Sequence, residues 1–80
     1  MLTEEIKLKL ERALPGAEVK VINESSRHFG HSPKGEHIGV TVKYQGFKDK
    51  SMVEQHQMIY NILKEEMKEK IHALVINTEA

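Results

Sequence analysis

The chain lacks cysteine and tryptophan and carries no excess of charge. Without cysteine it cannot form a disulfide, a thiolate metal site or a cysteine nucleophile of its own. Its 12 basic and 12 acidic residues cancel, which removes any long-range attraction to nucleic acid or to an anionic membrane. No apolar run approaches membrane-spanning length, and none of signal-peptide length opens the chain. We therefore expect a cytoplasmic protein that does not bind membranes.

The length of 80 residues suits one domain, residues 1–80, with one modest core. Chains of this size bury only about 60% of their unfolded surface, which leaves no room for a deep interdomain cleft. The glycines match neither a phosphate-binding loop nor a dinucleotide motif, and no Gly-x-x-Gly occurs to grip a nucleotide backbone. We therefore expect a binding protein and not an enzyme.

Hydrophobic spacing predicts the first half of the fold. Thr3 can cap a helix that ends at Pro15. Residues 17–25 are rich in β-branched side chains and indicate a strand. Residues 38–44 alternate strictly between apolar and polar, which is typical of a second strand with one buried face.

The second half repeats the pattern of helix and strand. Ser51 and Glu54 form a capping box, and the helix it starts has apolar spacing that continues to Met67. Residues 71–78 are apolar on both faces, as expected of a buried central strand. The order α-β-β-α-β predicts an α+β sandwich, a three-stranded sheet with helices packed on it.

Five histidines are the most informative residues of the chain, because neutral imidazole is the commonest metal ligand. Three crowd the segment between the first two strands, one lies on the second helix and one opens the last strand: His28, His31, His37, His56 and His72. We interpret His37, at the start of the second strand, as structural, and His56, on the helix, as structural or as part of a surface for a partner.

A mononuclear zinc site is one hypothesis for the others. His28 and His31 have the spacing of a zinc-binding pair, His72 could be a third ligand, and Glu24 or Glu36 a fourth. No recognisable zinc motif supports this set.

Four stretches in order carry a resemblance to a known family: NESSRH (23–28), GFKDKS (46–51), HQMIYNIL (56–63) and IHAL (71–74). Together they resemble the BolA family over nearly the whole chain. The resemblance implies a fold similar to class II KH domains. It also implies a monothiol glutaredoxin as partner and a [2Fe-2S] cluster shared with that glutaredoxin and glutathione.

The resemblance further implies the metal ligands. His72 matches the C-terminal histidine of the family and His28 its loop histidine, with His31 close enough to substitute. Histidine ligation of one iron with thiolates on the other is known iron-sulfur chemistry. Because this chain has no thiolate, the cysteine and glutathione sulfurs must come from outside it.

Two departures from the family pattern bear on function. Many members read Arg-His-Arg on the second helix where this chain has Gln55-His56-Gln57, which removes two positive charges from a helix proposed to touch nucleic acid. Many members read Ser-His-Phe where this chain has Glu36-His37-Ile38.

The sequence therefore favours an adapter or regulatory protein that acts in iron-sulfur cluster trafficking or iron sensing. The alternative is a KH-like nucleic-acid-binding transcriptional regulator, for which we expect only weak binding. A third interpretation is an interaction domain without metal. For the isolated chain we expect a monomer or a weak homodimer.

Overall fold

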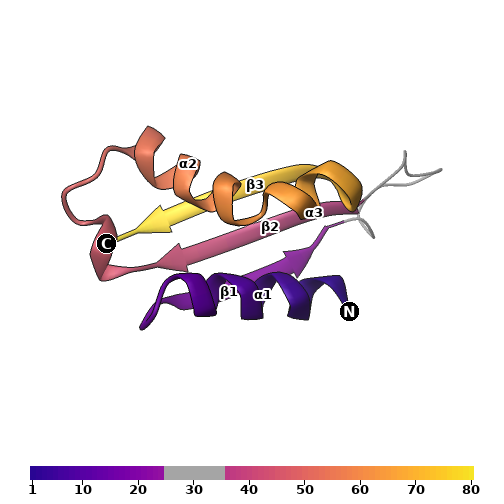
Figure 1. Ribbon diagram of the computed structural model, residues 1–80, viewed down its shortest axis with the longest axis horizontal. Coiled ribbons are helices and arrows are strands. Elements are labelled where there is room, and N and C mark those ends of the chain that lie inside the picture. Colours follow the sequence, from indigo (N-terminus) through magenta and orange to yellow (C-terminus); the bar gives the residue numbers. More distant parts are fainter. Residues whose placement is uncertain (25–35) are drawn as a thin grey trace.

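The computed structural model describes residues 1–24 and 36–80. Along the chain the elements are α1 (Leu2–Ala13), β1 (Glu18–Asn23), β2 (Glu36–Lys43), the 3-10 turn η2 (Gln45–Phe47), α2 (Met52–Ile62), α3 (Lys64–Glu69) and β3 (Ile71–Glu79) (Figure 1). The predicted α+β class, with one three-stranded sheet and helices packed on it, is confirmed.

The strands lie in the order β1-β2-β3, with β1 antiparallel and β3 parallel to β2. The prediction that the last strand is central was wrong, because β2 is central and β3 lies at an edge. Although β2 is central, it is not apolar throughout, because only one of its faces is covered by helices. On the other face Thr41 and Lys43 are exposed to solvent.

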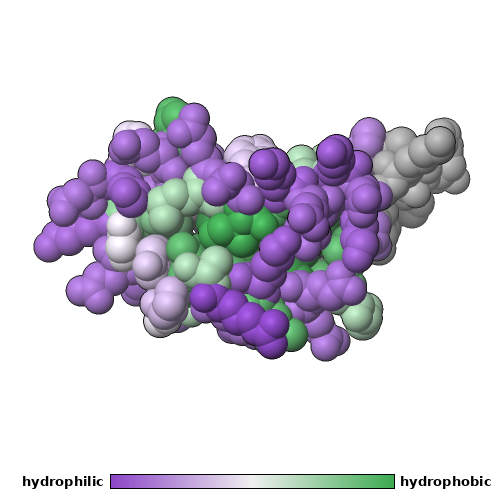
Figure 2. Space-filling model, viewed as in Figure 1, coloured by the Kyte–Doolittle hydropathy of each residue, from purple (hydrophilic) through white to green (hydrophobic). Residues whose placement is uncertain are grey.

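The core lies between the sheet and the helices, which cover one face of the sheet (Figure 1). Alternate residues of β2 point into it and meet side chains from α1, η2 and the second helical segment. The fully buried members are Ile6, Leu10, Ile38, Val40, Val42, Phe47, Ile59 and Leu63. Figure 2 shows the helical side, where an apolar strip lies between rows of hydrophilic residues. No helix formed by residues 1–24 or 36–80 covers the opposite face of the sheet.

The helix ends differ in part from the sequence prediction. Helix α1 begins two residues earlier than a Thr3 cap would place it, since Met1 is the N-cap and its carbonyl accepts from the Glu5 amide at 3.1 Å. The predicted stop is confirmed. Gly16 adopts φ +86°, a conformation that glycine takes without strain, and the chain turns there into β1.

The predicted second helix is two helices that meet at Leu63. Its capping box is confirmed: the Glu54 amide donates to the Ser51 hydroxyl at 3.1 Å, and the Ser51 amide donates to the Glu54 carboxylate at 2.8 Å. Leu63 leaves helical geometry while its side chain stays buried. The break lets α3 turn towards α1, where Lys9 contacts Glu66 through both carboxylate oxygens at 2.9 and 3.0 Å.

Among the described residues, no helix is both long enough and apolar enough to cross a membrane.

Candidate functional site

Strand β1 ends, and strands β2 and β3 begin, at the same end of the sheet, which we call the loop end: it comprises Asn23, Glu24, Glu36, His37 and residues 70–72. Three hydrogen bonds hold the chain together there. The backbone amide of Glu24 donates to the His37 carbonyl at 2.7 Å, and that of Glu36 donates to the Lys70 carbonyl at 3.0 Å. The side-chain amide of Asn23 donates to the Glu36 carboxylate at 2.7 Å. The loop end is therefore a defined scaffold on which side chains can be fixed.

A β-bulge positions His72 at the loop end. Glu36 pairs with Ile71, but the next residue, His37, pairs with Ala73, so that His72 is an extra residue on β3. Bulges bend a strand locally and redirect side chains, and they are frequent beside functional sites. Here the bulge accompanies close approach of two imidazole rings.

The His37 and His72 ring centroids lie 5.2 Å apart, with the ring planes tilted by 39°. His72 is exposed, whereas His37 is half-buried on the central strand. The structure therefore brings together two histidines that are far apart in the sequence. One of them, His72, was predicted as a ligand; the other was interpreted as structural.

The other two predicted ligands, His28 and His31, lie outside the described residues. His56 is half-buried on α2, a different element from the two strands that carry the histidine pair.

The zinc hypothesis gains no support from the part of the chain that the structure describes. No three histidine, aspartate or glutamate side chains converge there. Of the two proposed acidic ligands, Glu36 accepts the hydrogen bond from Asn23. Glu24 lies over the backbone of Gly39, where an added Cβ would come 2.7 Å from its carboxylate.

The histidine pair defines what the site can do chemically. Neutral imidazole binds zinc, copper and iron, and the exposed ring is open to a metal presented by another molecule. The chain supplies nitrogen ligands and no sulfur. Such a site can complete a metal centre whose other ligands belong to a partner.

Helix α2 has a polar residue that sequence reasoning misread. Gln55 donates to the carbonyls of Phe47 and Lys50 at 3.2 and 2.9 Å, and its carbonyl oxygen accepts from the Thr78 hydroxyl. The amide thus ties the start of α2 to the preceding turn and to β3. At the position where many family members have arginine, Gln55 therefore has a structural role in this chain.

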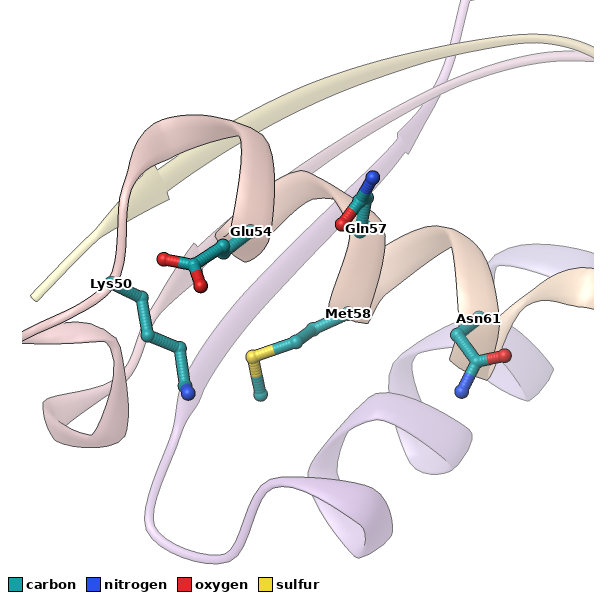
Figure 3. A pocket seen from close by; sticks show the side chains of 5 residues that line it. All are labelled: Lys50, Glu54, Gln57, Met58 and Asn61. Atoms are coloured by element: carbon teal, nitrogen blue, oxygen red, sulfur yellow. The ribbon is translucent and has the colours of Figure 1, made fainter.

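A hollow of about 450 Å³ lies beside α2, a different element from the two strands that carry His37 and His72. Figure 3 shows the side chains around it: Lys50, Glu54, Gln57, Met58 and Asn61. The carboxylate here already serves the capping box, and hydrogen bonds from the Ser51 backbone and side chain hold the pKa of Glu54 below its ordinary value. The start of α2 lies at the end of the molecule opposite the loop end (Figure 1). The hollow is therefore separate from the histidine site.

A mixed three-stranded sheet with its helices on one face, and with an exposed histidine at one end, defines a class of small α+β domains. Residues 10–80 match the model of one family in that class, described as BolA-like protein. The chain belongs to the BolA-like family.

Its relatives include both multidomain and small proteins. The chain is 35% identical over 79 residues to SufE-like protein 1, chloroplastic/mitochondrial, of Arabidopsis thaliana, and this match covers 89% of the chain but 21% of that protein. It is 32% identical over 78 residues to the DNA-binding transcriptional regulator BolA of Escherichia coli (strain K12), covering 98% and 74%.

Solved structures of BolA proteins have the same fold as this chain. The BolA domain of SufE1 from Arabidopsis thaliana superimposes with a TM-score of 0.84 at 33% identity, covering 98% of this chain and 90% of that one.

Proposed function

We propose that this protein is an adapter that binds a monothiol glutaredoxin and co-ligates a glutathione-dependent [2Fe-2S] cluster, in iron-sulfur trafficking or iron sensing. His72 supplies one ligand, and His28, or His31 in its place, supplies the second. A cysteine of the glutaredoxin and the thiol of glutathione supply the sulfur ligands.

The observation that supports this proposal most directly is the exposed His72 on its bulge. The His72 side chain is exposed, while its backbone belongs to β3, directly after α3, and is flanked by residues paired with β2. A ligand fixed in this way loses little conformational entropy when it binds metal. The donor set fits half of a mixed histidine and thiolate cluster, and the lack of cysteine makes the partner's sulfur necessary.

The proposal predicts that the cluster depends on the partner. The isolated chain, reconstituted with iron and sulfide, should hold no stable cluster. A mixture with a monothiol glutaredoxin and glutathione should give a coloured heterodimer whose visible absorption comigrates with both proteins in size-exclusion chromatography. A mixture without glutathione is the control. A stable coloured protein formed by the isolated chain would contradict the shared site.

The nucleic-acid alternative is supported by the names of several relatives, among them the Escherichia coli protein, which are called DNA-binding transcriptional regulators. Against it, α2 contains no lysine or arginine and has one glutamate, and the net charge of the chain is zero. Phosphate contacts by basic side chains supply most of the affinity for DNA. We therefore expect weak, steeply salt-dependent retention in a gel-shift assay. Tight, sequence-specific retention at physiological salt would place this alternative first.

A further inference from the structure

The two edges of the sheet are protected differently. Strand β1 is six residues long and carries Glu18 and Lys20. Strand β3 is nine residues long, and residues 71–78 include no aspartate, glutamate, lysine or arginine. No strand among the described residues pairs with its outer edge. Charges, short length and bulges are the usual means by which proteins prevent an edge strand from pairing with another chain. After its bulge at His72, β3 has no such protection until Glu79.

The backbone groups available on this edge follow from one hydrogen bond. The Glu79 carbonyl accepts from the Tyr44 amide, at the end of β2, at 2.8 Å and therefore points inward. Backbone groups of successive strand residues point to alternate sides, and no register shift interrupts β3 after its bulge. The amides and carbonyls of Leu74, Ile76 and Thr78 therefore point away from the sheet.

We propose that the outer edge of β3 binds the same edge of a second copy of this chain, antiparallel and around a two-fold axis at Val75. The two sheets then form one continuous sheet. Leu74 of each copy pairs with Ile76 of the other through both backbone hydrogen bonds, which uses the outward amides and carbonyls of these two residues. The same surface serves both copies, as two-fold symmetry requires.

Charge favours this register. With the axis at Val75, Glu79 falls opposite Ile71 of the second copy, between Lys70 and His72. Moving the axis one residue earlier would bring Glu79 towards Glu69 of the second copy, and like charges directly opposite are destabilising.

The absence of charge along the strand also favours a second copy as the occupant. Self-pairing places every side chain against a copy of the same segment, so a charged strand would repel itself, whereas residues 73–77 are uncharged. Val75 is 53% exposed on the face without helices. Pairing would cover part of this apolar side chain with its counterpart.

Cross-linking tests the register. The backbone groups of Val75 point inward, so the two copies of this residue form a non-hydrogen-bonded pair with Cα atoms about 4.5 Å apart, within the range for a disulfide. The chain has no cysteine, so Val75→Cys adds the only thiol. In a glutathione redox buffer we expect a covalent dimer. The matched control is Ile22→Cys, 51% exposed on β1 and on the same face, which should stay monomeric.

Sedimentation from micromolar to millimolar concentration tests the association itself. The wild-type chain should dimerise reversibly. Val75→Lys places two ammonium groups together at the axis and should weaken the dimer about tenfold or more, whereas Ile22→Lys should match the wild type. A wild-type chain that stays monomeric throughout would overturn the proposal. Equal weakening by both lysine substitutions, or equal cross-linking by both cysteines, would also overturn it, because association would then occur through the face of the sheet.

Discussion

At the scale of residues, His72 depends on a single extra residue in β3. In a regular strand the residue after Ile71 would pair with His37; the bulge instead makes Ala73 that partner and leaves His72 beside the ring of His37. The ring is therefore placed by backbone pairing before any metal is present.

We expect His72→Ala to abolish the histidine-type visible circular dichroism of the reconstituted heterodimer. His28→Ala should weaken or alter the spectrum, and only His28→Ala combined with His31→Ala should match the loss at His72, because a neighbouring loop histidine can substitute. His56→Ala is the matched control and should leave the spectrum unchanged.

The far-ultraviolet spectrum of His72→Ala should also match the wild type, since an exposed side chain is removed. An unaltered visible spectrum for this variant would show that the ligand assignment taken from the family is wrong here.

Gln55 gives a second prediction. Gln55→Ala removes an amide that satisfies two carbonyls and accepts from Thr78, and the loss of partly buried hydrogen bonds costs about 1–2 kcal/mol. The free energy of unfolding, measured in urea, should fall by this amount. Gln57→Ala, two residues along and exposed, should change it by less than about 0.5 kcal/mol. Equal effects of the two substitutions would contradict the structural role of Gln55.

These two residues show where sequence reasoning stopped. The place of His72 between a helix and a strand was predicted from local pattern alone. The bulge, the contact with His37 and the three partners of Gln55 all depend on segments that are distant in sequence, and no local pattern specifies them. The departure at Gln55 was read only as lost charge.

At the scale of elements, the pair of Lys9 and Glu66 joins α1 to α3. Burial raises the pKa of Glu66. The hydrogen bond from Lys9, a hydrogen bond with the Glu66 backbone and the charges of Lys9 and Lys70 together lower it more, and the pKa lies below its ordinary value of 4.5. A carboxyl with a lowered folded-state pKa stabilises the fold above its unfolded pKa, and this contribution is lost as pH falls through the folded pKa.

We therefore expect Lys9→Met to lower the free energy of unfolding by about 1 kcal/mol at neutral pH. The difference from the wild type should shrink as pH falls from 4.5 through the folded-state pKa of Glu66, below which Glu66 is protonated in both proteins. Lys7→Met, an exposed lysine on the same helix, is the control and should show no such pH dependence. Urea titrations from pH 7 to pH 3 measure both; a constant difference would contradict the assignment.

Elements were predicted best where their signals are local. The capping box at Ser51 and the alternation in β2 belong to this kind. The break at Leu63 was missed because the apolar spacing continues through it. The edge position of β3 was missed because a strand that follows a crossover helix can dock on either side of its neighbour, and the uncharged sequence resembled that of a buried strand.

At the scale of the whole molecule, the helices lie on one face of the sheet (Figure 1). His37 and His72 lie at the loop end of β2 and β3. The molecule is elongated, with extents of 42 × 22 × 20 Å. The exposed His72 and the outer edge of β3 belong to the same strand, whereas the polar hollow lies beside α2.

The parallel pairing of β2 with β3 has a consequence for folding. Strands β1 and β2 are antiparallel neighbours in sequence, but β3 can join β2 only after the whole α2 and α3 crossover has closed, and such non-local pairing slows folding. We expect β3 to dock last. Until it does, an uncharged aliphatic segment has both of its backbone edges open, and refolding at high protein concentration should lose material to aggregation at this step.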